Sequence, residues 1–282
     1  MISYAQNFED VMLARCFRDQ ADGFYVDVGA WDPTRDSITR HFYDRGWRGI
    51  NVEPSPHHFA AFPAARPGDV NLNVALGAAP GSVVFHEFAG TPLSTTRHAF
   101  ARNFEKLGMA RRDVVVPVTT LRAVCEAHAA RPIDFLKIDV EGDERDVIAG
   151  GAWDVWRPRV VLVEALSPYV RVPQWHAWEG ILLAHRYAFV HFDGLNRFYV
   201  REEDRGLAEH FATPPNLFDD FTPWRLAGLA ARRDAWRAER AETLACAAEL
   251  ERLAAGRPGP DAGVLRAAAA RLGRLADWFP ED

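Results

Sequence analysis

Short apolar runs recur along the chain, and most of them finish on an acidic residue. Runs of aromatic and β-branched residues of this length are typical of buried strands. Residues 24–28 read FYVDV, and Gly29 follows them in a turn where a backbone can approach a ligand closely. The other runs that end on an acid lie at 49–53, 135–141, 160–164 and 187–193, and further strands are predicted at 70–76, 81–88, 114–118 and 196–200.

Segments with helical periodicity separate several of these strands. A helix predicted over 8–17 takes Asn7 as its N-terminal cap, and further helices are predicted at 37–45, 57–65, 121–129, 144–150 and 175–185. Alternating strands and helices predict an α/β fold with a mostly parallel, doubly wound sheet. A short polar joint connects 187–193 to 196–200, so we expect an antiparallel hairpin at the end of that sheet.

The acids that end the strands indicate the charge of the ligand. In a parallel sheet the carboxyl ends of the strands lie along one edge, where ligands bind. We therefore expect a cluster of negative side chains there, which repels phosphate and attracts a cation. A sulfonium with an ammonium group and a ribose diol fits this edge better than a dinucleotide does. The acids are Asp27, Glu53, Asp139, Glu141, Glu164 and Asp193.

Composition excludes several classes of protein. The net charge is −6 and no block of clustered Lys and Arg occurs, which argues against nucleic acid as the main partner. The three cysteines, Cys16, Cys125 and Cys246, match no metal-ligand or disulfide spacing and suit a reducing compartment. No apolar run has the length of a signal peptide or a membrane span, so we expect a cytoplasmic protein.

The composition changes near residue 221. Residues 223–282 are rich in Ala, Arg, Leu and Glu and carry 10 Arg against 9 acids, whereas residues 1–222 carry the net negative charge. We predict a catalytic domain over 1–222 and an α-helical hairpin over 223–282, interrupted by the turn residues of 256–260. We expect this extension to form a homo-oligomer or to bind a partner.

Seven ordered motifs carry a family resemblance. SYAQNFED, VDVGAWDP, INVEP, NLNVALG, LSTT, VTTL and FLKIDVEG together resemble the FkbM family of S-adenosylmethionine-dependent methyltransferases, over residues 3–164. The later segment HFDGLNRFYV is similar to members found in bacterial polysaccharide and glycan gene clusters. The resemblance implies a Rossmann-like class I methyltransferase fold and methylation of a hydroxyl oxygen. The family often has a small or polar residue at the position of Trp31.

The resemblance also implies cofactor contacts. By position, Asp27 and Gly29 hold the methionine end of S-adenosylmethionine, Glu53 takes the two ribose hydroxyls, and Asn73, Val74 and Ala75 border the adenine. We count Ala30, Pro54 and Asp139 with the cofactor-binding residues. The residues support Glu53 separately, because a carboxylate at the tip of the second strand can accept from both hydroxyls of a ribose and repels a phosphorylated one.

The segment from Lys137 to Glu141 holds the candidate catalytic groups. Lys137, Asp139 and Glu141 alternate along the strand and its exit, so they share one face. Either Asp139 or Glu141 acts as general base, or a divalent cation bound by Asp139 with Glu164 or Asp193 lowers the pKa of the acceptor hydroxyl. A structural ion pair is the alternative. His191 is a further candidate base, although its position equally suits a core or edge histidine.

A second group of residues is assigned to the acceptor. The hydroxyl-rich loop 89–96 offers Ser94 and Thr95, and Glu164, Asp193 and Asn196 follow or end later strands. The leading hypothesis is an O-methyltransferase acting on a small-molecule or glycan acceptor, such as a sugar or a glycosylated natural product. A non-catalytic nucleoside-binding or interaction module is a second hypothesis. A nucleotide-dependent oxidoreductase is disfavoured because residues 29–31 lack a G-x-G-x-x-G loop.

Overall fold

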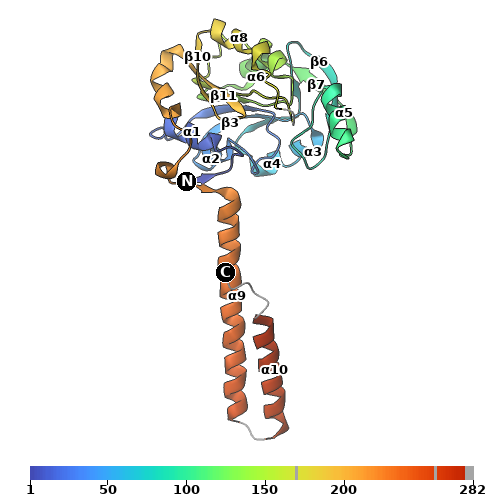
Figure 1. Ribbon diagram of the computed structural model, residues 1–282, viewed down its shortest axis with the longest axis vertical. Coiled ribbons are helices and arrows are strands. Elements are labelled where there is room, and N and C mark those ends of the chain that lie inside the picture. Colours follow the sequence, from blue (N-terminus) through green and yellow to red (C-terminus); the bar gives the residue numbers. More distant parts are fainter. Residues whose placement is uncertain (169–170, 257–258, 277–282) are drawn as a thin grey trace. The chain divides into compact units, whose positions relative to one another are not determined.

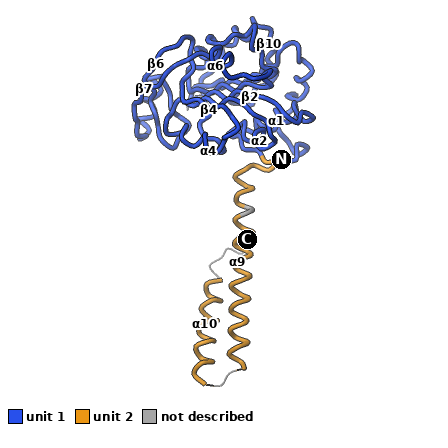
Figure 2. Tube along the Cα trace, turned by 180° about the vertical axis from the view of Figure 1, so that it is seen from behind, with its two compact units in different colours: residues 1, 3–221 blue, residues 2, 222–282 orange. Residues whose placement is uncertain are grey.

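The computed structural model describes residues 1–168, 171–256 and 259–276. These divide into two compact units, which Figure 2 shows in different colours. The first comprises Met1 and Ser3–Phe221, and the second comprises Ile2 and the described residues from Thr222 onward. Residues 277–282 of the expected helical extension lie outside the described residues.

A seven-stranded sheet forms the centre of the first unit (Figure 1). Its strand order is β10-β11-β9-β8-β2-β3-β4. The neighbours from β9 to β4 pair in parallel, whereas β11 is antiparallel to both β9 and β10. The α/β fold, the mostly parallel sheet and the terminal antiparallel hairpin are therefore confirmed. The strands are β2 (Phe24–Val28), β3 (Arg48–Val52), β4 (Val70–Leu72), β8 (Phe135–Ile138), β9 (Val160–Glu164), β10 (Tyr187–Phe192) and β11 (Asn196–Arg201).

Two apolar cores cover the two faces of this sheet. Alternate residues of β2 point to opposite sides, so that Val26 packs with α6 (Leu121–His128), α7 (Glu144–Ala149) and α8 (Glu179–Ala184). Tyr25 instead packs with α1 (Glu9–Cys16) and α2 (Arg40–Asp44) on the other face. Figure 1 shows α6 and α8 on one side of the sheet and α1 and α2 on the other. The carboxyl ends of the parallel strands are thus fixed between two packed layers.

The expected strand at 70–76 is wrong as a single element. The chain leaves the main sheet after Leu72 and enters β5 (Ala75–Leu76), which belongs to a separate three-stranded sheet. There β5 pairs in parallel with β7 (Arg112–Thr119), and β7 pairs antiparallel with β6 (Gly81–Glu87). Asn73 stabilises this change of direction, because its side-chain amide donates to the carbonyls of Glu53 (2.8 Å) and Pro54 (3.0 Å).

Two expectations about helices are also wrong in detail. Asn7 does not cap α1, because Phe8 is the N-terminal flanking residue, in a left-handed conformation, and the Asn7 amide donates to the carbonyl of Asp193. The helix expected over 57–65 is two short helices, α3 (Pro56–Phe59) and α4 (Phe62–Ala65). Pro63 lies in the first turn of α4, and its missing N–H prevents one continuous helix.

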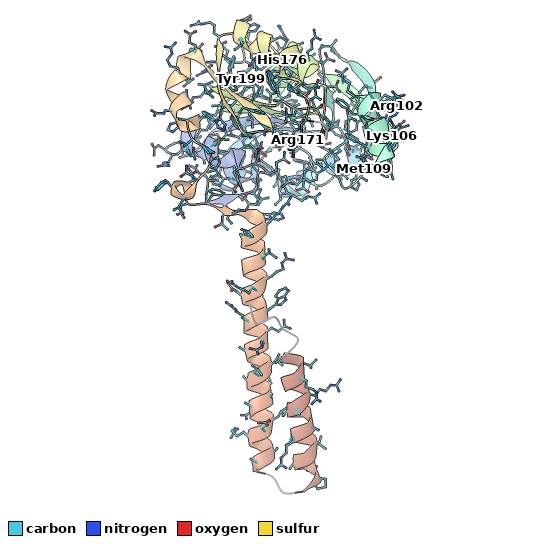
Figure 3. All side chains as sticks on the ribbon, in the orientation of Figure 1. Arg102, Lys106, Met109, Arg171, His176 and Tyr199 are labelled. Atoms are coloured by element: carbon cyan, nitrogen blue, oxygen red, sulfur yellow. The ribbon has the colours of Figure 1, made fainter. Side chains whose placement is uncertain are left out.

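Helix α5 (His98–Lys106) shows how the outer helices are divided between core and solvent. Ala101 and Phe104 are buried, whereas Arg102 and Lys106 are exposed on the outside of the unit, as Figure 3 shows. The remaining elements of this unit are short. They are the 3-10 helices η1 (Trp175–Ala177), η2 (Glu202–Phe211) and η3 (Leu217–Asp219). The two-residue strand β1 (Ile2–Ser3) is divided between the units, because Ile2 belongs to the second.

The second unit is a pair of helices. It contains β12 (Thr222–Pro223), α9 (Trp224–Ala255) and α10 (Pro260–Ala276), and α10 packs alongside α9 (Figure 1). Its buried side chains are small: Ala254, Ala262, Ala269 and Ala276. Large apolar side chains remain exposed on the same helices, namely Leu226, Leu229, Trp236, Leu244, Leu253, Val264 and Leu275.

Candidate active site

A pocket opens at the carboxyl ends of β2, β3 and β8. It encloses about 860 Å³ of space, open mouth included. The residues that the sequence assigned to the cofactor, the acceptor or catalysis and that line this pocket are Gly29, Ala30, Glu53, Pro54, Val74, Ala75, Ser94, Lys137, Asp139 and Glu141.

The turn at Gly29 forms the floor of the pocket. Its φ is +78°, and a Cβ added there would lie 1.7 Å from the carbonyl oxygen of Asp139. The N–H groups of Gly29 and Ala30 both donate to the carbonyl of Val52, at 2.9 and 3.1 Å. Only glycine combines this backbone conformation with so close an approach of β2 to the end of β8.

Glu53, just beyond β3, is almost completely buried against the pocket wall. Its carboxylate oxygens accept from the backbone N–H groups of Trp31 and Ser55, both at 2.8 Å. Burial raises the pKa of Glu53 to about 7, although these two donors and Lys137 favour its ionised form. Each carboxylate oxygen has a second lone pair, so Glu53 can still accept from a ligand.

Lys137 connects Asp139, which lines the pocket, with Asp27, which does not. The parallel register sets Asp27 beside Lys137, and the ammonium lies 3.3 Å from Asp27 Oδ1 and 3.6 Å from Asp139 Oδ2. It also donates to the carbonyl of Gly29, at 2.5 Å. Burial by itself would lower the pKa of Lys137, but the attraction of Asp27 and Asp139 raises it above the ordinary value. Lys137 is therefore a permanent cation that fixes the Gly29 turn.

Asp27 lies behind this lysine and not among the pocket-lining residues. It is 2% exposed and also accepts from the hydroxyl of Thr39. Its place in the structure is that of a positioning group for Lys137. The sequence pattern of the strand does not predict this role of Asp27, because it does not indicate which of the buried side chains lines the pocket.

Three carboxylates meet on the other side of Lys137. Asp139, Glu141 and Glu164 each place one ligand atom within 4.8 Å of the others. Burial, and then repulsion by Asp139, raises the pKa of both Glu141 and Glu164 well above the ordinary value. Glu144 lies nearby and accepts from the N–H groups of Val140 and Gly142 at 3.2 and 3.1 Å, which orders the turn.

The two hydroxyls of the 89–96 loop have different positions. Ser94 lines the pocket, and its Oγ accepts from the N–H of Phe88. Thr95 is fully buried and donates to the carbonyl of Glu141 at 2.8 Å. Thr95 therefore holds the Glu141 turn in place and does not face the pocket.

Three other candidates lie away from the pocket. Asp193 accepts from the N–H groups of Leu195 and Asn196 and so closes the β10–β11 turn. The Asn196 amide donates to Glu9, at 2.8 Å, and is 3% exposed. His191 lies on β10 against the ring of Phe198. None of the three lines the pocket, because the antiparallel hairpin directs them toward α1 and the sheet edge.

Several pocket residues, including Gln6, Asp36 and His58, were not among the residues predicted from the sequence. Trp31, noted only as a departure from the family pattern, has a φ of +51° and lies with its ring 6.3 Å from that of His58. Arg35 lies over the Trp31 ring at 4.3 Å. Apart from His58, on the short helix α3, these residues come from loops, where neither periodicity nor strand-end position identifies a side chain that faces a ligand.

Comparison with known families agrees with this geometry. A family model described as "Methyltransferase FkbM domain" matches residues 27–189, more than half of the chain, from the middle of β2 into β10. The chain belongs to the FkbM methyltransferase family. The match covers every pocket-lining residue except Gln6, including the turns after β2, β3 and β8. No curated protein sequence matches the chain.

Membership in the FkbM family identifies the protein as a methyltransferase. The mixed α/β fold with its mostly parallel sheet is the Rossmann-like fold that this family implies. In the described part of the chain, no helix is at once long enough and apolar enough to span a bilayer.

Proposed function

We propose that this methyltransferase uses S-adenosylmethionine to methylate a hydroxyl oxygen of a sugar, a glycan or a glycosylated natural product. The observation that carries the proposal is the buried Glu53 at the end of β3, beside the Gly29 turn, in a pocket whose nearest side-chain charges are mostly negative. Such a pocket favours a cationic nucleoside over a phosphate-bearing one.

The residues present fit S-adenosylmethionine by their chemistry. Glu53 has free acceptor capacity for the two ribose hydroxyls, and Val74 and Ala75 provide an apolar wall for the adenine. Asn73 supports that wall through its bonds to the carbonyls of Glu53 and Pro54. Gly29, Ala30 and Asp139 surround the position of the methionine portion. The cofactor supplies an electrophilic methyl group.

The protein's own task is to orient the acceptor and to accept its proton. The cofactor would supply a methyl group whose sulfur keeps the electron pair of the carbon–sulfur bond, so the protein would have to hold the acceptor oxygen in line with that bond. The hydroxyl proton passes to a carboxylate, for which Asp139 and Glu141 are the candidates that line the pocket. Ser94 and Glu164 border the same region and are assigned to the acceptor.

Two measurements test this function. Calorimetry of the full chain should show tight binding of S-adenosylhomocysteine and no binding of NAD. A panel of glycans and glycosides, incubated with S-adenosylmethionine, should give one product heavier by a single methylene unit. Binding of neither nucleoside would refute the enzyme function and favour a non-catalytic interaction module.

We further propose that the described helices of residues 223–282 pair with a second copy of the chain. A two-helix unit whose interior is alanine leaves Leu229, Trp236 and Leu275 exposed to water. Helix α9 is also charge-divided, with five Arg and two acids in 224–240 but one Arg and three Glu in 241–255. An antiparallel partner of the same sequence would match these halves and cover the apolar side chains. We place the protein in the cytoplasm, in keeping with its three free cysteines.

A further inference from the structure

Two neighbouring strands bring three carboxylates to one place beside the pocket. β8 and β9 pair in parallel, so Asp139, which follows β8, and Glu164, which ends β9, emerge at the same edge. Glu141 joins them from the turn after β8, where its φ is +55°. The three groups each place one oxygen within 4.8 Å of the others.

The side chains around this cluster do not satisfy it. Glu141 is 9% exposed, and its Oε2 has no hydrogen-bond partner among the residues that the structure describes. The carboxyls of Asp139 and Glu164 are close enough to hydrogen-bond, which two ionised carboxylates cannot do by themselves. A buried carboxylate oxygen without a partner is costly, and a positive group at the centre of the cluster would offset that cost.

Lys137 does not supply that group. Its ammonium is 3.6 Å from Asp139 but is shared with Asp27, at 3.3 Å, and with the carbonyl of Gly29. The Lys137 ammonium is therefore fixed on the side of Asp139 that faces β2. The unpartnered Oε2 of Glu141 and the carboxyl of Glu164, which ends β9, belong to the cluster on the other side of Asp139. With all three carboxyls ionised, one shared ammonium leaves the cluster with an excess of negative charge.

We propose that Asp139, Glu141 and Glu164 bind a hard divalent cation, Mg²⁺ or Mn²⁺, at the edge of the methyl-transfer pocket. The inference rests on the proposed function and specifies its acceptor. Three carboxylate oxygens with no nitrogen or sulfur donor are the ligand set that such cations prefer. The Asp139 side chain is 25% exposed, so part of the coordination sphere faces the pocket.

That open side defines the acceptor class. Neighbouring hydroxyls of a sugar can replace cation-bound water, which fixes the acceptor next to the methyl group. A hydroxyl bound to the cation has a lower pKa and loses its proton to water more readily, so that Asp139 and Glu141 serve as ligands of the cation and neither has to act as the general base. The cation thus favours an acceptor with two adjacent hydroxyls over one with an isolated hydroxyl.

The test uses the full chain after removal of metal with a chelator. Mn²⁺ titration, followed by electron paramagnetic resonance, should show one site per chain from which Mg²⁺ displaces Mn²⁺. Glu164→Gln should weaken Mn²⁺ binding at least tenfold, as should Glu141→Gln. The matched control is Glu126→Gln, an exposed glutamate on α6, which should bind as the unchanged chain does. Equal Mn²⁺ binding by the unchanged chain and Glu164→Gln, or none by either, would overturn the proposal.

Two further measurements on the same samples distinguish loss of the cation site from misfolding of the variant and from failure of the proposed methyltransferase function. Without metal, Glu164→Gln should melt no lower than the unchanged chain, because it removes repulsion within the cluster, and Mg²⁺ should raise the melting temperature of the unchanged chain only. A Mg²⁺ shift of equal size in both chains would count against the site. If S-adenosylhomocysteine binds while no cation does, the cation site fails and the proposed function stands; if the nucleoside does not bind, the proposed function fails.

Discussion

Replacing Glu53 tests the cofactor site most directly. Glu53 accepts from the N–H groups of Trp31 and Ser55, so Glu53→Gln alters the loop as well as any ribose contact. An amide retains one acceptor oxygen, and one buried backbone donor then faces an NH₂ group, at a cost of about 1–3 kcal/mol. The loss of charged acceptors for two ribose hydroxyls adds about 1.5–3 kcal/mol for each bond. We expect S-adenosylhomocysteine affinity to fall by about 100-fold or more.

A double-mutant cycle, with one change in the protein and one in the ligand, separates the effect on the loop from the loss of the ribose contact. Calorimetry compares S-adenosylhomocysteine with its 2′-deoxyribose analogue in the unchanged chain and in Glu53→Gln. Removal of the 2′-hydroxyl should weaken binding by about tenfold in the unchanged chain and much less in the variant, because the partner of that hydroxyl is already lost. If Glu53→Gln weakens both ligands by the same factor and the hydroxyl still contributes fully, the assignment of Glu53 to the ribose is wrong.

The pH dependence gives an independent readout of the same residue. Burial raises the pKa of Glu53 to about 7, and a cationic ligand that hydrogen-bonds to the carboxylate favours the ionised form. The affinity for S-adenosylmethionine, which is such a ligand, should therefore rise with pH until Glu53 is fully ionised. It should be lower at pH values below the pKa of Glu53. In Glu53→Gln this dependence should disappear. An unchanged pH profile in the variant would contradict the linkage.

Three further predictions concern other parts of the chain. Gly29→Ala places a Cβ 1.7 Å from the carbonyl oxygen of Asp139 at a φ of +78°, so it should lower the melting temperature and abolish S-adenosylhomocysteine binding. The control Gly46→Ala, at a φ of +96° with no atom within 4 Å, should keep S-adenosylhomocysteine binding. Equal binding by both variants would refute the close approach at Gly29. Burial, reinforced by Asp193, raises the pKa of Glu9 from 4.5 to about 8, so the native state retains a proton that the unfolded chain loses and stability should fall as pH rises from 4.5 through 8. Urea unfolding at pH 5 and pH 9 should show Glu9→Gln gaining stability relative to the unchanged chain at the higher pH, and a constant difference would contradict this. Deletion of residues 223–282 should reduce the oligomeric state in size-exclusion chromatography with light scattering and leave nucleoside affinity intact; an unchanged oligomeric state would exclude pairing through these helices.

Sequence patterns located the strands and the charge of the site. Aromatic and β-branched residues in 24–28 identified β2, the apolar run that leads to Asp139 and Glu141 identified β8, and the short polar joint before Asn196 identified the antiparallel hairpin. Position alone also placed Glu53 and Gly29 at strand ends, because parallel strands must leave the sheet along one edge. Local signals were sufficient where the relevant contact is between a residue and its own strand or turn.

Long-range packing decided the rest. Residues 70–76 carry one continuous strand pattern, yet the structure divides them between two sheets, since strand propensity does not specify a partner strand. Asp27 and Asn196 are polar residues at or near strand ends like Glu53. The Asp27 side chain pairs with Lys137, and the Asn196 side chain donates to Glu9, so neither lines the pocket.

The amino-acid sequence by itself therefore determined the fold class, the family and the acidic edge of the sheet, all of which depend on patterns within a few residues. Only the tertiary structure decided which acids share a site. Asp139, Glu141 and Glu164 meet because β8 and β9 lie side by side and Thr95 holds the Glu141 turn. Contacts between residues so far apart in the chain are set by how the layers pack, and no local pattern encodes them.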